Sequence, residues 1–117
     1  MKKILWLSQH KWLPKQEAEL RRLFGEIALD RDILPFENAE DIIRRVREGG
    51  YDEVVVVVPL WVLYRLCELN LQPRPLWAEM KEVKTRREAD VVVKGRFYRF
   101  YRFRRVKRVT IEFEELE

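Results

Sequence analysis

Short runs of apolar residues alternate along the chain with segments whose apolar residues recur at helical spacing. Residues 3–8 form a nearly continuous apolar run, which is typical of a strand that is covered on both faces. The five valines of residues 54–58 favour a central strand, because β-branched side chains suit extended backbone. Residues 27–34 predict a weaker strand whose aspartates place it at a sheet edge. Residues 76–83 predict a fourth strand.

Three helices are predicted between these strands. The first begins at Pro14, which the first turn of a helix tolerates, and stops at Gly25. The second follows the N-cap residue Asn38 and carries its apolar residues on one face. Those residues are Ala39, Ile42, Ile43 and Val46. The third begins at Pro59, and two further prolines break the chain before the fourth strand.

Residues 1–83 therefore read β-α-β-α-β-α-β. Strands that alternate with helices indicate a parallel sheet, and the short connections favour a minimal Rossmann-like version of it. From residue 85 the apolar period becomes two, which predicts antiparallel strands at 90–93 and 96–103 around a glycine turn. Residues 105–114 predict one more strand. We expect a single α/β domain over residues 1–117, with a C-terminal antiparallel β-hairpin region at about residues 85–114.

Composition narrows the class of protein further. The chain has 117 residues, 47% of them hydrophobic, which is enough for a core and excludes intrinsic disorder. The charged fraction of 38% together with few Asn and Gln residues is typical of a thermophile. Cys67 is the single cysteine, so no intrachain disulfide forms. No apolar run reaches the ~18–20 residues of a membrane span, and the first residues lack the features of a signal peptide. We expect a cytoplasmic protein with no membrane partner.

Positive charge is concentrated in one segment. The net charge is +4, yet residues 81–108 alone contain twelve Lys and Arg against three Asp and Glu. Within that segment, residues 96–105 interleave arginines with aromatic residues, which suits phosphate contact and base stacking. Arg99 and Arg102 are the candidate ligand-binding residues there. The alternative is a strand whose aromatic residues pack while its arginines reach into solvent. Regular alternation would put Phe100 on one face and Phe103 on the other.

The loop after the first strand carries the other candidate chemistry. In open α/β sheets, ligands bind beyond the carboxyl ends of the strands, where helix N-termini favour anions. The candidate ligand-binding residues there are Ser8, Gln9, His10, Lys11 and Gln16, with Trp61 expected beside them. His10 could contact a ligand, act as general acid or base, or brace the loop. Ser8 and His10 are the candidates for any catalysis, and Trp61 could stack on a base, join a dimer or line the core.

Several site classes are disfavoured by what the chain lacks. There is no G-x-G-x-x-G and no G-x-x-x-x-G-K-[ST] sequence, so no dinucleotide cofactor is expected. His10 is the single histidine and no cysteine pair exists, which disfavours a zinc site. A Ser-His-Asp hydrolase would need a G-x-S-x-G elbow, which is also missing.

The run from Ile4 to His10, followed by Pro14, Gln16, Leu20 and Phe24-Gly25, resembles the opening of small CRISPR-associated Rossmann-fold (CARF-like) proteins. The resemblance implies a dimer that binds cyclic oligoadenylate at the carboxyl edge of the sheet, with metal-independent cleavage in the ring-nuclease members. It also implies that Ser8 and His10 face the ligand and that Gln16 lies at the helix start. Leu13 stands where the family pattern has threonine. Later segments, including residues 103–109, resemble uncharacterised small proteins of phages and mobile elements.

Three hypotheses follow. The first is a homodimer that binds a phosphate-rich nucleotide or short cyclic oligonucleotide at the carboxyl edge, with or without cleavage. The second is a non-enzymatic accessory protein of a mobile element that binds RNA or DNA through the basic segment. The third is a protein that binds a partner protein through its exposed tryptophans.

Overall fold

The computed structural model describes all 117 residues and contains one six-stranded sheet in the order β2-β1-β3-β4-β6-β5. The strands are β1 (Lys2–Leu7), β2 (Ile27–Asp32), β3 (Glu53–Val56), β4 (Leu76–Val83), β5 (Val91–Val93) and β6 (Arg96–Arg105). The helices are α1 (Pro14–Phe24), α2 (Ala39–Gly49) and α3 (Leu60–Glu68), with the 3-10 turn η1 (Arg86–Glu88). The first four strands pair in parallel and the last two antiparallel, so the mixed α/β prediction is confirmed.

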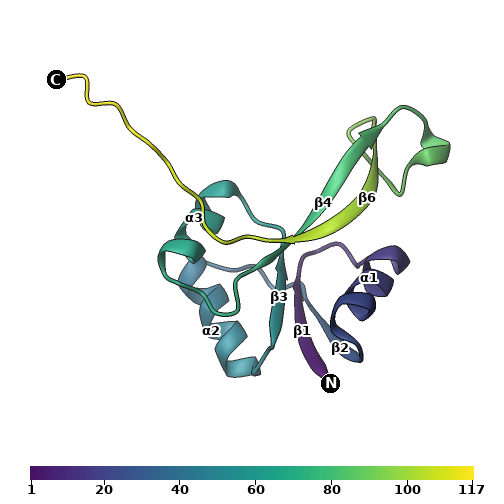
Figure 1. Ribbon diagram of the computed structural model, residues 1–117, viewed down its shortest axis with the longest axis horizontal. Coiled ribbons are helices and arrows are strands. Elements are labelled where there is room, and N and C mark those ends of the chain that lie inside the picture. The colour runs from purple at the N-terminus through teal and green to yellow at the C-terminus, as the bar shows by residue number, and fades with distance from the viewer.

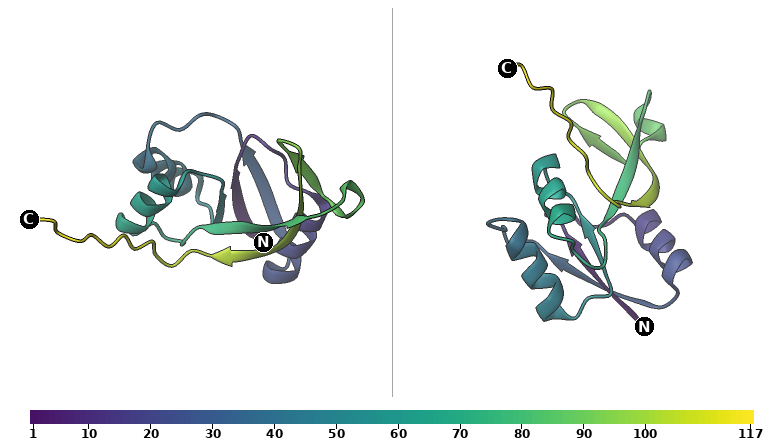
Figure 2. Two further views of the ribbon diagram at one scale, coloured as in Figure 1. Left: turned by 90° about the horizontal axis from the view of Figure 1, so that it is seen from above. Right: turned by 60° about the vertical axis from the view of Figure 1, so that its left-hand side comes forward.

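Helices cover both faces of the parallel strands. Figure 1 and the right-hand view of Figure 2 show α1 on one side of the sheet and α2 with α3 on the other. Alternation along β1 explains this arrangement, because Ile4 and Trp6 pack with Leu20 of α1, while Leu5 and Leu7 pack with the buried residues of α2 and α3. Both faces are buried over residues 4–7 of β1 and residues 54–56 of β3, which explains why these stretches are continuously apolar.

The last strands leave the layered part of the molecule and form a projecting ribbon. β3 pairs with β4 at one position, Val55 opposite Leu76. From Trp77 onward, β4 pairs with β6 alone, and β5 extends the ribbon on the far side of β6. Figure 1 shows this ribbon pointing away from the helices. We call residues 1–76 the body and residues 77–105 the arm.

A bulge in β6 overturns the expected alternation of its side chains. Glu79 lies opposite Arg102 and Met80 lies opposite Phe100, so Tyr101 has no partner on β4. The extra residue moves the following side chains to the other face. Phe100 and Phe103 therefore lie on the same face, with ring centroids 5.0 Å apart, rather than on opposite faces as a regular strand would place them.

The strand predicted over residues 105–114 is wrong. β6 ends at Arg105, and residues 106–117, which we call the C-terminal segment, contain no helix or strand. β4 begins at Leu76 opposite Arg105, so no strand lies beside the chain past that point. Val106 and Val109 still pack against the core of the body, and Figure 1 shows the remainder extending away from the helices. An alternating pattern without a neighbouring strand leaves extended but unpaired backbone.

An ion pair with a buried carboxylate joins the arm to the body. Glu53 begins β3 with its side chain 8% exposed, and Arg105 at the end of β6 donates to both carboxylate oxygens at 2.9 and 2.8 Å. Arg105 also donates to the carbonyl of Arg74, and the Val106 N–H donates to the carbonyl of Pro75. These bonds connect β3, the turn before β4 and the end of β6 at the base of the arm.

Removing this cation should destabilise the protein far more than removing its neighbour. Arg105→Met leaves the Glu53 carboxylate buried without its partner, and we expect a loss of about 2 kcal/mol of unfolding free energy. Arg104→Met is the matched control, because Arg104 is exposed and pairs with Glu79 at 3.7 Å, and should cost less than about 0.5 kcal/mol. Urea denaturation measures both values. Equal losses would show that the pair does not hold the arm.

Candidate functional site

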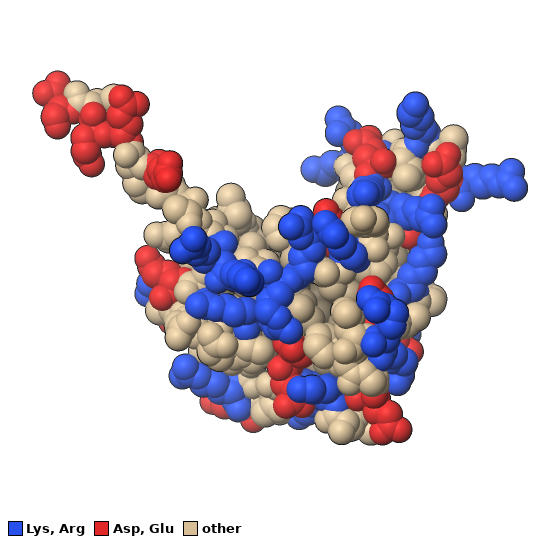
Figure 3. Space-filling model, viewed as in Figure 1, with Lys and Arg blue, Asp and Glu red and all other residues tan.

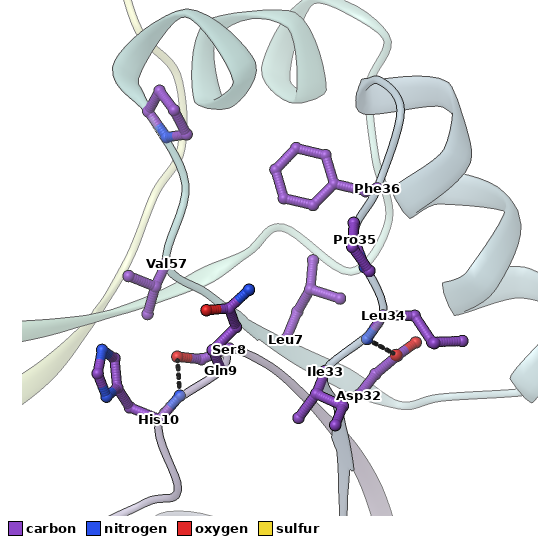
Figure 4. A pocket seen from close by; sticks show the side chains of 11 residues that line it. Leu7, Ser8, Gln9, His10, Asp32, Ile33, Leu34, Pro35, Phe36 and Val57 are labelled. Carbon is purple, nitrogen blue, oxygen red and sulfur yellow. Dashed lines mark hydrogen bonds between the residues drawn. The ribbon is translucent and has the colours of Figure 1, made fainter.

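A cavity of about 310 Å³ lies at the carboxyl ends of β1, β2 and β3. We call it the rim cavity. Its wall is formed by the last residues of β1 and β2 and by the residues that follow the three strands. These are Leu7, Ser8, Gln9 and His10 at the end of β1, Asp32 to Phe36 at the end of β2, and Val57 and Pro59 after β3. Figure 4 shows these side chains around one opening. The expectation that Ser8, His10 and Pro59 share one edge of the sheet therefore agrees with the structure.

The loop after β1 is shaped by hydrogen bonds to its backbone. The Trp6 indole N–H donates to the His10 carbonyl at 2.8 Å, and the His10 backbone N–H donates to the Ser8 hydroxyl at 3.1 Å. The hydroxyl thus bonds to the backbone rather than to the imidazole, so the structure contains no activated Ser-His pair. The imidazole is exposed and forms no hydrogen bond with the protein, so it is free to bind a ligand.

The loop after β2 carries a carboxylate whose charge is already balanced. Arg45 of α2 donates to Asp32 at 3.3 Å and to the carbonyls of Leu34 and Pro35. Asp32 also accepts from the Leu34 N–H at 2.9 Å. No Lys or Arg lines the rim cavity. The cavity is lined mostly by apolar surface and by no cation, which differs from the expected attraction to phosphate at this edge.

Three of the residues predicted to contact a ligand lie outside the rim cavity. Gln16 is buried, and its side-chain carbonyl accepts from the Leu13 N–H at 2.8 Å, so it caps α1. Lys11 is exposed beside the Trp12 ring. Trp61 is exposed on the first turn of α3. The loop between β1 and α1 is long enough that the start of α1 does not meet the edge where Ser8 and His10 lie.

The arm presents a second surface of different chemistry. Cross-strand neighbours share a face of a sheet, so Trp77 with Arg104, Glu79 with Arg102, and Lys81 with Arg99 all lie on one side. Tyr101, the bulged residue, joins them, since the Lys81 ammonium lies 3.6 Å from its ring centroid and the Arg102 guanidinium 4.8 Å away. We call this surface the basic face. Its residues are Trp77, Glu79, Lys81, Arg99, Tyr101, Arg102 and Arg104.

Two features of the basic face suit an anionic, planar ligand. Trp77 is 54% and Tyr101 49% exposed, which leaves aromatic surface open to solvent. Glu79 accepts from Arg102 at 2.7 Å, and this bond is the main reason that the pKa of Glu79 lies below its ordinary value. The pair holds the Arg102 guanidinium over the sheet next to Tyr101. The opposite face of the ribbon, with Phe100 and Phe103, packs towards the body.

The residues that sequence reasoning missed are Trp77, Lys81 and Tyr101. The arginine-aromatic run pointed to β6, but strict alternation divided its side chains wrongly between the faces. A pairing of residues 76–83 with residues 97–105 would have brought Trp77 and Lys81 beside the arginines. No local signal marks the bulge at Tyr101, because tyrosine fits an ordinary strand as well.

An ion pair between α1 and the arm holds the ribbon against the body. The Lys15 ammonium lies 2.9 Å from Asp90, and the same carboxylate accepts from the Phe100 N–H at 2.8 Å. Burial by itself raises the pKa of Asp90, but the hydrogen bonds from Lys15 and Phe100 outweigh it and the pKa lies below its ordinary value. Asp90 is therefore charged in the folded protein down to lower pH than in the unfolded chain.

No protein-family model, curated protein or solved structure matches this chain. The resemblance to CARF-like proteins consequently stays a prediction, and function has to be argued from the structure itself. None of the three α-helices combines the length and the apolar character that crossing a bilayer requires. No group of three or more His, Cys, Asp or Glu side chains converges as a metal site would require.

The Asp90 contact predicts a defined dependence of stability on pH. A lowered pKa adds stability above the unfolded-state value of about 3.9, and this stability disappears as the pH falls through the folded-state pKa. Asp90→Asn can still accept from Phe100 but cannot titrate. We expect the variant to melt below the wild type at pH 7 and to match it near pH 2, as thermal denaturation will measure. An equal difference at both pH values would contradict the assignment.

Proposed function

We propose that the protein binds single-stranded nucleic acid through the basic face of the arm. The observation that carries this proposal is the exposure of Trp77 and Tyr101 among arginines on one open sheet surface. Exposed aromatic rings accept unpaired bases by stacking, while neighbouring cations bind the phosphates. Bases inside a duplex are already stacked on each other, so this combination favours single strands.

The charge of the arm and of the first residues of the C-terminal segment supports the same proposal. Of the twelve Lys and Arg within residues 81–108, four pair with carboxylates and eight do not. The unpaired ones are Lys81, Lys84, Arg86, Arg87, Lys94, Arg99, Lys107 and Arg108. Figure 3 shows basic side chains at the far end of the arm and across the surface where the arm joins the body. Ions released from a polyanion by such a surface contribute most of the affinity at low salt.

Substitutions on the basic face should weaken binding of a fluorescent single-stranded oligonucleotide. Tyr101→Ala removes one stacking ring, and we expect the Kd to rise by about 5- to 150-fold. Lys81→Ala with Arg99→Ala removes two phosphate contacts and should flatten the salt dependence of log Kd by about one to two units. Fluorescence anisotropy over a salt series measures both effects.

The control for this experiment is Lys2→Ala with Arg47→Ala, which removes two exposed, unpaired cations from the body. If it weakens binding as much as the arm variant does, net charge rather than the basic face is responsible. Ser8→Ala and His10→Ala should leave oligonucleotide binding unchanged. A loss with those two variants and none with the arm variants would move the site to the rim cavity.

A second candidate function belongs to the rim cavity. The parallel strands follow the order β2-β1-β3-β4, and open α/β sheets bind ligands where the strand order reverses, which here is between β1 and β3. The rim cavity opens there and presents the Ser8 hydroxyl and the free His10 imidazole. Its volume lies at the lower end of the range for small-molecule sites. These features favour a nucleotide or part of a cyclic oligonucleotide as ligand. They favour binding over cleavage, because no Lys or Arg lines the cavity to stabilise a developing phosphorane charge.

Calorimetry with cyclic tetra-adenylate and cyclic hexa-adenylate tests the second candidate. If the rim cavity binds either ligand, we expect His10→Ala and Ser8→Ala to abolish the heat of binding while Arg99→Ala retains it. Absence of heat with both ligands would remove this candidate and leave the first untouched.

A further inference from the structure

The C-terminal segment has the pattern of a strand but no strand beside it. Val109, Ile111 and Phe113 alternate with Arg108, Thr110 and Glu112. Val109 packs against the body, whereas Ile111 is half exposed and Phe113 is 85% exposed. Alternating side chains on extended backbone are stabilised when a second strand supplies hydrogen bonds on one side and apolar contacts on one face.

The arm, in turn, has a strand edge without a neighbouring strand. β4 pairs with β3 at Leu76 and with nothing on that side from Trp77 to Val83, so a row of backbone donors and acceptors is open there. Open strand edges accept another extended chain. Trp77 adds an exposed apolar side chain at the start of this edge.

Charge selects which chain would occupy the edge. Residues 110–117 contain four glutamates and no Lys or Arg, whereas the arm contains ten Lys and Arg against four Asp and Glu. Figure 3 shows acidic side chains at the end of the C-terminal segment, basic ones on the arm, and a hollow between the two. Within one chain, Val106 and Val109 hold the base of the segment on the body, and Figure 1 shows it directed away from the arm. The complementary surfaces therefore face outward, where another copy can reach them.

We propose that two copies of this chain exchange C-terminal segments, each segment adding as a strand to the free edge of β4 in the other copy. Glu112 and Glu114 then lie along the basic face, while Ile111 and Phe113, which alternate with them, cover the opposite side of the ribbon beside Ala78 and Met80. The exchange is reciprocal, so it closes as a two-fold dimer. It does not depend on the proposed function, although a docked acidic segment and a nucleic acid would compete for the same cations.

The test is sedimentation velocity on the full chain without nucleic acid, over a range of protein concentration. We expect a dimer at low salt whose Kd rises by at least about tenfold in high salt, because screening weakens charge complementarity. A variant that stops after Val109 should be a monomer with an unchanged melting temperature, since residues 110–117 are all exposed and none of them packs in the core. A monomeric full chain, or a dimer that survives the truncation, would overturn the proposal.

Two further sets of variants locate the contact. Phe113→Ser should weaken the dimer, whereas Leu116→Ser, at an equally exposed position outside the apolar alternation, should not. Reversing the segment (Glu112, Glu114 and Glu115 to Lys) or the arm (Lys81→Glu with Arg99→Glu) should each abolish self-association, and mixing the two reversed proteins should restore a heterodimer. If the mixture stays monomeric, the arm is not the docking surface. Oligonucleotide binding by the truncated monomer, measured separately, reports on the proposed function alone.

Discussion

The junction at Leu76 determines the shape of this molecule. One residue pair with β3 starts β4 inside the sheet, and everything after it on β4 depends on β6 for hydrogen bonds. The pair between Glu53 and Arg105 and the packing of Phe103 against Trp6 compensate for the short contact. Without them, the ribbon would be a two- to three-stranded sheet with little support, which is marginal by itself in water.

This junction separates two kinds of chemistry. On the body side, the parallel strands end together and surround a small, mostly apolar cavity whose single carboxylate is balanced by Arg45. On the arm side, a flat surface combines aromatic rings with excess positive charge. A small ligand that needs enclosure fits the former, and a long flexible polyanion that needs many weak contacts fits the latter. The left-hand view of Figure 2 shows the ribbon apart from α2 and α3, with α1 beside it.

The elements of the body could be predicted from the sequence because their signals are local. The valines of β3, the Asn38 cap and Gly25 each act within a few residues, and alternating strands and helices imply parallel pairing. The edge shared by Ser8, His10 and Pro59 followed from that topology. No strand forms at residues 106–114, because an alternating pattern needs a neighbouring strand to pair with and none lies beside this part of the chain. The expected attraction of the rim cavity for phosphate is not supported, because no Lys or Arg lines the cavity and Arg45, thirteen residues beyond Asp32, is engaged with that carboxylate. The side chains of β6 were assigned to the wrong faces because Tyr101 has no partner on β4, which shifts the alternation of the side chains along the strand.

The uneven placement of charge gives the molecule a large electric dipole moment, with its positive end at the arm and its negative end at residues 112–117. In the field of a polyanion, a molecule with such a dipole rotates before contact, so that the ribbon faces the polyanion and the glutamates face away from it. Fewer encounters with a polyanion then begin in an unproductive orientation, which would accelerate the binding proposed above even where the final contacts are individually weak.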